Sequence, residues 1–182
     1  MQFMQTEHLN IRRMVPEDWS DLYRYLCSEE SQKYQNKGAY TKKQCIEEIQ
    51  EMSQLNTSWS VCLKSNGTVI GFITLPQVLP NNSRTFKLHF NFDTNYIVNG
   101  FVQEANQRML QYAFEELQAH RVIGLTCAQD TLSNKEFAKL HMRKEAILQK
   151  AFTYRNTKTN KPIWWDIYSF AILKEEWLRI VR

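Results

Sequence analysis

Alternating and helical patterns of apolar residues divide the chain into strands and helices. The stretch from Phe86 to Leu117 shows both patterns most clearly. Apolar and polar residues alternate over positions 86–93, which is typical of a strand with one buried face. After a polar turn ending at Gly100, apolar residues recur at helical spacing and predict a long amphipathic helix. That apolar stripe consists of Val102, Ala105, Met109, Leu110, Ala113, Phe114 and Leu117.

The chain before this stretch is predicted to form a strand, two helices and a hairpin. Residues 8–13 alternate like a short strand. Pro16, Glu17 and Asp18 place a proline and two acids where the first turn of a helix favours them. Thr41 is a suitable N-cap for a second helix. An Asn-Gly pair at 66–67 then predicts a tight turn between two strands, at residues 57–64 and 68–75.

The chain after the long helix is predicted to form three strands and two helices. The apolar run at 122–128 indicates a buried strand, and a short helix follows with Asp130 or Thr131 as its cap. Two further strands, at 144–154 and 163–173, enclose a polar hairpin tip, and a helical tail ends the chain. The order predicts a mixed α/β (α+β) fold with a mostly antiparallel, twisted sheet of about seven strands flanked by helices. Without linkers or repeats, we expect one domain over residues 1–182.

Composition narrows the class of protein. Hydrophobic residues make up 43% of the 182 positions and aromatic residues 13%, which indicates a globular chain. No apolar run approaches the roughly 18 residues of a membrane span. The first residues lack the apolar core of a secretory signal. We therefore expect a cytoplasmic protein that does not bind membranes.

Charge and metal-binding residue types exclude two further classes. The net charge is +4, and the basic residues do not cluster, so we expect no direct binding of nucleic acid. The four histidines and four cysteines match no metal-binding spacing, so we expect no metal site. The cysteines have mostly core-like neighbours, which predicts reduced, buried thiols.

Short motifs follow one another in a consistent order along most of the chain. They lie at residues 6–13 with 16–18, 93–96, 99–101 with 104–105, 112–117 with 120–122, Thr131 and Ser133 with 139–140, and 165–166 with 174–177. In this order they resemble motifs of the GNAT superfamily of acetyl-CoA-dependent N-acetyltransferases. The most similar branch includes the RimJ/RimL-type acetyltransferases of ribosomal-protein N-termini.

The resemblance implies a binding site for acetyl-CoA. The turn that holds the pyrophosphate through backbone N–H groups corresponds to Val98, Asn99, Gly100, Phe101, Val102 and Gln103. The strand whose backbone pairs with the pantetheine arm corresponds to Asn91, Phe92 and Asp93. The helix bordering the thioester contains Asp130, Ser133 and Asn134, and Ser133 matches the serine that is proposed to protonate the leaving thiolate in some relatives.

Several of the predicted site residues also have a structural interpretation. Gly100 fits a phosphate turn or simply a turn that requires positive φ. Ser133 fits a general acid or a hydroxyl that bonds the backbone near a helix start. His89 fits a base that accepts a proton from the substrate amine, or a partly buried histidine that fills space. Asp166 follows two tryptophans and fits a carboxylate that binds the substrate amine.

Three features depart from the family pattern. In the turn, Val98 stands where the first glycine is usual, and Val102 stands where a small residue is usual. His141 and Met142 stand where a glycine-aromatic pair usually closes the later helix, and Asp130 stands where an asparagine usually precedes Ser133. A valine restricts the backbone and crowds the close approach that glycine allows. The negative charge of Asp130 is less favourable than an amide near a phosphate.

The combined pattern favours an N-acetyltransferase. It would transfer acetyl from acetyl-CoA to a primary amine, on a protein N-terminus or a small molecule, by direct attack in a ternary complex. We expect it to act as a monomer or a homodimer. The alternative is a non-catalytic GNAT-like binding module, which the substituted turn glycines would favour.

Overall fold

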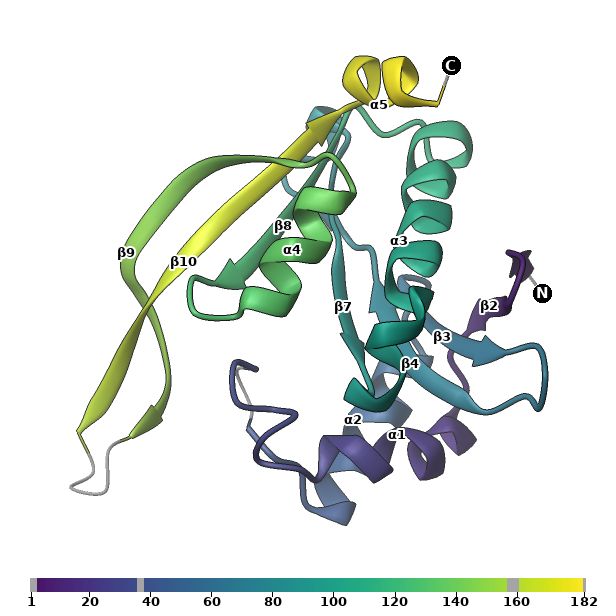
Figure 1. Ribbon diagram of the computed structural model, residues 1–182, viewed down its shortest axis with the longest axis vertical. Helices are drawn as coiled ribbons and strands as arrows, with labels where there is room; N and C mark the ends of the chain where they lie inside the picture. The colour runs from purple at the N-terminus through teal and green to yellow at the C-terminus, as the bar shows by residue number, and fades with distance from the viewer. Residues whose placement is uncertain (1–2, 36–37, 157–160, 182) are drawn as a thin grey trace. The chain divides into compact units, whose positions relative to one another are not determined.

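The computed structural model describes residues 3–35, 38–156 and 161–181 (Figure 1), without the side chains of residues 98 and 154–156. Contacts divide the chain into two compact units. The first unit holds residues 1–33, 39–75 and 89–108. The second unit holds residues 34–38, 76–88 and 109–182. Part of the predicted hairpin tip, residues 157–160, lies outside the described residues.

The first unit contains an antiparallel five-stranded sheet in the order β1-β2-β3-β4-β7. The predicted turn at Asn66 and Gly67 joins β3 to β4, with Gly67 at φ +75°. All six residues of β3 are buried, so both faces of this central strand are covered. The strands are β1 (Phe3–Gln5), β2 (Leu9–Arg13), β3 (Ser58–Leu63), β4 (Val69–Thr74) and β7 (His89–Phe92).

Two helices pack on this sheet as the sequence predicts. A 3-10 turn (Pro16–Asp18) leads into α1 (Trp19–Leu26). Thr41 caps α2 (Lys42–Ser53), and its Oγ1 accepts a 3.3 Å hydrogen bond from the N–H of Gln44. Their apolar faces meet β3 and β4 in one buried cluster of Met14, Leu22, Tyr25, Leu26, Cys45, Ile49, Cys62, Val69 and Phe72.

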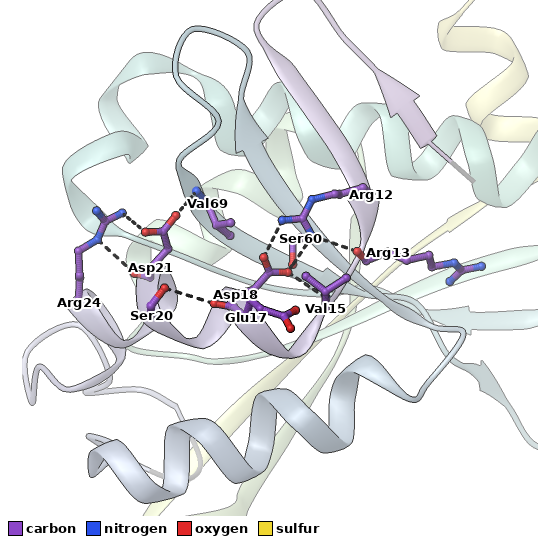
Figure 2. A network of polar contacts seen from close by, with 10 residues as sticks. All are labelled: Arg12, Arg13, Val15, Glu17, Asp18, Ser20, Asp21, Arg24, Ser60 and Val69. Carbon is purple, nitrogen blue, oxygen red and sulfur yellow. Dashed lines mark hydrogen bonds and ion pairs between the residues drawn. The ribbon is translucent and has the colours of Figure 1, made fainter. Parts of the chain in front are cut away.

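A buried carboxylate ties the first of these helical turns to the sheet (Figure 2). Asp18 accepts hydrogen bonds from Arg12 Nη1 and Nη2, at 2.8 and 2.6 Å. It also accepts from the N–H of Val15 at 3.0 Å and from Ser60 Oγ at 2.6 Å. These bonds satisfy both carboxylate oxygens, which is what a buried charge requires. The same contact raises the pKa of Arg12.

The second unit contains another five-stranded sheet, in the order β5-β6-β8-β10-β9. Within the described part of this sheet, only the pairing of β6 with β8 is parallel. The strands are β5 (Gln77–Val78), β6 (Thr85–Lys87), β8 (Arg121–Cys127), β9 (Arg143–Asn156) and β10 (Pro162–Leu173). β9 forms one edge, and β9 and β10 make a long two-stranded arm (Figure 1). This arm exposes Ile147, Leu148, Phe152 and Trp164.

Aromatic stacking holds two helices to the second unit. In α4 (Thr131–Lys139), the ring of Phe137 stacks on Phe170 of β10, with centroids 5.2 Å apart. In α5 (Lys174–Ile180), Trp177 stacks on Phe114 at 5.3 Å. Phe114 lies in a π-helical turn (Tyr112–Glu116) that ends the long helix, α3 (Phe101–Gln111). The predicted apolar stripe of this helix is buried, apart from a partly exposed Leu117.

The structure corrects the prediction of one continuous strand at 86–93. The alternating stretch is divided at Leu88 into β6 and β7, which belong to different sheets. Asn91 and Asp93, predicted on the polar face, are only 8% and 7% exposed. Because alternation continues through the change of sheet, the pattern alone does not reveal it.

Other differences from the sequence prediction are smaller. The described residues form more strands than the predicted seven, because β1 and β5 are too short to show a pattern and the stretch at 86–93 is divided into β6 and β7. Cys27 is exposed, whereas Cys45, Cys62 and Cys127 are buried, and all four are free thiols. Burial raises the pKa of the Cys45 thiol to about 11. No helix in the described part of the chain is long and apolar enough to cross a membrane.

Candidate functional site

The start of α3 is built by local hydrogen bonds. Directly after β7, Asp93 Oδ1 accepts from the backbone N–H and the Nδ2 of Asn95, at 3.0 and 2.9 Å. A 3-10 turn (Thr94–Asn99) follows and ends at Gly100, which has φ +78°. The N–H of Glu104 then donates to the carbonyl of Gly100 at 3.0 Å, which is the first helical hydrogen bond. Gly100 therefore provides the left-handed conformation that the turn requires.

The N–H groups of Phe101, Val102 and Gln103 precede this first helical bond. They have no acceptor within the helix, and the helix dipole places partial positive charge beside them. Such an N-terminus can hold a phosphate group. A Cβ on Gly100 would meet no atom within 4 Å, so this side of the turn is open.

The burial of Val102 favours packing over the predicted crowding of a ligand. Val102 is 3% exposed, so the side chain points into the protein interior. The crowding of a bound cofactor by this side chain stays a prediction. The side chain of Val98 lies outside what the structure describes.

A carboxylate in the first turn of α3 is held by the other end of the chain. Glu104 accepts from the N–H of His8 at 2.8 Å and lies 2.9 Å from its Nδ1. Partial burial raises the pKa of Glu104, but hydrogen bonds from Thr6 and His8 outweigh it and leave the pKa below its ordinary value. The ring of His8 also lies 5.8 Å from that of Phe101. These contacts engage the negative charge that lies in the first turn of α3.

Only some of the backbone N–H and C=O groups at β7 point toward the neighbouring strand β4. The N–H of Asp93 bonds the carbonyl of Ile70 in β4 at 2.9 Å, so the alternation of an antiparallel pair directs Asn91 to β4 as well. The carbonyl of Asn91 also accepts from Tyr25 Oη at 3.0 Å. Of the three predicted pantetheine-pairing residues, Phe92 therefore directs its N–H and C=O away from β4. It does so on the outer strand of this sheet.

His89 begins β7 and pairs across the sheet with Thr74. The residue is partly buried, and its ring lies 6.2 Å from the ring of Phe72. This environment suits the space-filling interpretation and leaves a role as a base as a prediction. His89 shares the first unit with β7 and the start of α3.

The second unit contains the start of α4. Asp130 caps the helix, with its Oδ1 accepting from the N–H of Ser133 at 3.0 Å. Its Oδ2 accepts from Ser133 Oγ at 2.7 Å. Asn134 Nδ2 donates to the carbonyl of Ala128 at 3.0 Å, while its Oδ1 is buried without a partner in the described part of the chain. An unpaired amide oxygen can accept a hydrogen bond from a ligand.

Asp166 has a structural role in the arm. Its Oδ1 accepts from the N–H of Lys150 at 2.8 Å, and Lys150 has φ +47° at an irregularity in the pairing of β9 with β10. The carboxylate thus stabilises a bulge. The neighbouring Trp165 packs edge-on against Tyr34, with centroids 5.7 Å apart. The predicted binding of a substrate amine by Asp166 stays a prediction.

The predicted site residues therefore form two groups, each within its own unit. His89, Asn91, Phe92, Asp93 and the turn at 98–103 lie in the first unit, and Asp130, Ser133, Asn134 and Asp166 lie in the second. The sequence did not indicate Tyr25, or Gln32, whose Oε1 accepts from Asn91 Nδ2 at 3.0 Å. It also did not indicate Asn106 of α3, which is fully buried with both amide atoms unpaired among the described residues.

Comparisons of the sequence and of the structure with known proteins point to the same family. Residues 8–143 match the family described as acetyltransferase (GNAT) domain. Over 173 residues, the chain is 29% identical to an uncharacterized N-acetyltransferase, YnaD, of Bacillus subtilis (strain 168), covering 94% of this chain and 97% of that protein. A crystal structure of a GNAT-family acetyltransferase from Bacillus anthracis is similar with a TM-score of 0.86 at 27% identity. That match covers 96% of this chain and all of the other.

Two more distant structures share the fold. The ribosomal-protein-S5-alanine acetyltransferase of Vibrio fischeri has a TM-score of 0.77 at 16% identity, over 97% of this chain and 99% of that chain. The spermidine N-acetyltransferase of Vibrio cholerae, in complex with CoA and spermine, has a TM-score of 0.78 at 15% identity, over 95% of this chain and 99% of that chain.

Proposed function

Because the chain belongs to the GNAT family of acetyltransferases, we propose that it transfers an acetyl group from acetyl-CoA to a primary amine by direct attack in a ternary complex. The start of α3 is the observation that carries this proposal. Here β7 leads through a turn, in which Gly100 has a positive φ, into α3. The first three N–H groups of α3 have no acceptor within their own helix. This arrangement suits the pyrophosphate of acetyl-CoA.

Each part of the cofactor has a proposed partner. The backbone of Val98, Asn99, Gly100, Phe101, Val102 and Gln103 holds the pyrophosphate. The outward N–H and C=O of Phe92 pair with the pantetheine amides, while Asn91 and Asp93 fix the strand and the turn. Asp130, Ser133 and Asn134 border the thioester, and the buried Oδ1 of Asn134 supplies an acceptor.

The chemistry requires three tasks from the protein. The amine must lose a proton before it attacks, and His89 is the candidate that accepts it. The tetrahedral oxyanion requires a donor, for which a backbone N–H of β7 is suited. Ser133 lies in the first turn of α4 as the candidate near the leaving thiolate.

The acceptor is proposed to be a protein N-terminus or a small-molecule amine. Distant fold relatives include enzymes of both kinds, among them one for the alanine of a ribosomal protein and one for spermidine. We propose the whole chain as one domain in the cytoplasm, since the family match spans residues of both units. It would act as a monomer or homodimer, without direct binding to nucleic acid.

Thermal melting combined with an acetyl-transfer assay tests this function. Acetyl-CoA at about 100 times its Kd should add about 2.7 kcal/mol to the free energy of unfolding. Release of CoA should then be followed with two sets of acceptors, peptides with free N-termini and polyamines. The faster set identifies the acceptor class. A melting temperature unchanged by millimolar acetyl-CoA, together with no CoA release, would refute the proposal.

A further inference from the structure

The hydroxyl of Ser133 uses its single proton in a hydrogen bond to another side chain of the same protein. Ser133 Oγ donates to Asp130 Oδ2 over 2.7 Å, and the other carboxylate oxygen accepts from the N–H of Ser133. An ionised carboxylate only accepts hydrogen bonds, so the proton of this contact comes from the serine. Bonds of this charge-assisted kind are stronger than those between neutral groups.

A serine in this state presents an acceptor to a ligand. A hydroxyl has one proton and two lone pairs, and the proton here points to Asp130. To protonate a thiolate, Ser133 would have to break its bond to the carboxylate and leave two anions close together. The geometry therefore opposes the role of acid that the resemblance implies for this serine.

Resting on the proposed acetyl transfer, we propose that Asp130 is a positioning residue that holds Ser133 as a hydrogen-bond acceptor. The oxygen of Ser133 then faces a donor on the ligand, such as the N–H of the amine or of a pantetheine amide. The leaving thiolate takes its proton from water, and the proton that the attacking amine loses balances this step.

Asparagine at position 130 would reverse this hydrogen bond without changing its shape. The amide oxygen would keep accepting from the N–H of Ser133, and Nδ2 would replace Oδ2 and donate to Oγ. The hydroxyl proton would then be released toward the ligand. Asparagine is as good an N-cap as aspartate, so α4 should keep its stability.

Steady-state kinetics across pH tests the proposal with four variants. Asp130→Asn should raise kcat about 3- to 10-fold, because a freed hydroxyl becomes a general acid, and KM for acetyl-CoA should stay within about twofold. The gain should disappear in Asp130→Asn/Ser133→Ala. Ser133→Ala alone should raise KM, because it removes the proposed acceptor for the ligand, and should lower kcat by less than about tenfold. Thr131→Ala, which removes an exposed hydroxyl from the same turn, should match the wild type.

Opposite results would overturn the proposal. If Ser133→Ala lowers kcat more than about tenfold while Asp130→Asn does not raise it, Ser133 donates its proton despite Asp130. A gain in kcat that persists in the double variant would mean that position 130 acts through another group.

A ligand-free measurement separates this proposal from the proposed function. A hydroxyl proton of Ser133 protected from exchange should be visible by NMR in the wild type and absent in Asp130→Ala. If it is visible and no acceptor is acetylated, the positioning stands and the proposed function fails. If the wild type shows no protected hydroxyl, the positioning is refuted whatever the activity.

Discussion

His8 and Glu104 form a paired contact across 96 residues of sequence: the backbone N–H and the ring Nδ1 of His8 both meet the Glu104 carboxylate. The contact fastens the start of β2 to the first turn of α3. Because α3 starts beside the proposed pyrophosphate turn, this contact also keeps a negative charge occupied there. Because the pKa of Glu104 is lowered in the fold, the stabilisation by this contact should depend on pH.

Glu104→Gln should destabilise the protein in full above the ordinary pKa of a glutamate, near 4.5, and progressively less below it. The pKa of Glu104 is lowered in the fold, so its stabilising effect is complete above that value and is lost as pH falls through the folded pKa. Urea unfolding of both proteins from about pH 3 to pH 6 measures this difference.

Glu7→Gln is the matched control, because Glu7 is an exposed carboxylate whose oxygen lies 3.7 Å from Nε2 of the same histidine. It should change the free energy of unfolding by less than about 0.5 kcal/mol at every pH. A Glu104→Gln difference that stays constant down to pH 3 would contradict the lowered pKa.

Gly71→Ala should disturb β7. A Cβ at position 71 would lie 2.4 Å from Cδ1 of Phe92 and 2.8 Å from the carbonyl oxygen of Asn91. Overpacking of this kind should cost about 1–3 kcal/mol and weaken binding of acetyl-CoA, since the proposed pantetheine strand must shift. Isothermal titration and thermal melting measure the two effects. In Gly71→Ala/Phe92→Leu the smaller side chain should recover part of both, and no recovery would exclude the ring as the cause.

Val102→Ala should not tighten binding of acetyl-CoA. The side chain is buried, so its removal leaves a cavity and should cost about 1–3 kcal/mol of stability. If the variant instead binds acetyl-CoA more than about threefold tighter at equal stability, Val102 crowds the ligand after all. Asn99→Ala, at an exposed position in the same turn, serves as the control for binding.

Asp18→Ala should be among the most destabilising single substitutions in the first unit. It removes a buried carboxylate that accepts four hydrogen bonds and leaves Arg12 and Ser60 without it, which should cost about 3–5 kcal/mol. Asp21→Ala provides the comparison, because Asp21 is more exposed and accepts a 2.8 Å bond from the N–H of Val69. It should cost about 1 kcal/mol. Equal losses for the two variants would show that the burial of Asp18 contributes nothing.

Local features of the fold could be predicted from sequence because they depend on neighbouring residues. Thr41 and Asp130 each cap a helix by bonding a residue three positions later, and Gly67 and Gly100 adopt positive φ in turns that they mark. Helical periodicity likewise located α3, and runs rich in apolar and aromatic residues located β8 and β10. The prediction of one strand around Leu88 was wrong because the alternation continues where the chain passes from one sheet to the other.

The parts of the site that the sequence could not show depend on distant residues. Tyr25 reaches the carbonyl of Asn91 across 66 positions, and no local pattern marks either residue as a partner of the other. The same holds for His8 and Glu104. The bond from Ser133 to Asp130 is local, but its direction becomes visible only when the side-chain atoms are placed.

The outer strand of the arm has a consequence for handling the protein. Among the described residues β9 is the outer strand of its sheet, with exposed Ile147, Leu148 and Phe152 side chains, and such edges invite pairing with other chains. Lys144 and Lys150 supply repulsion between copies that opposes this. Salt screens such repulsion over about 10 Å at 0.1 M. Solubility should therefore decline as ionic strength rises, and concentrated stocks should keep best in buffers of low salt.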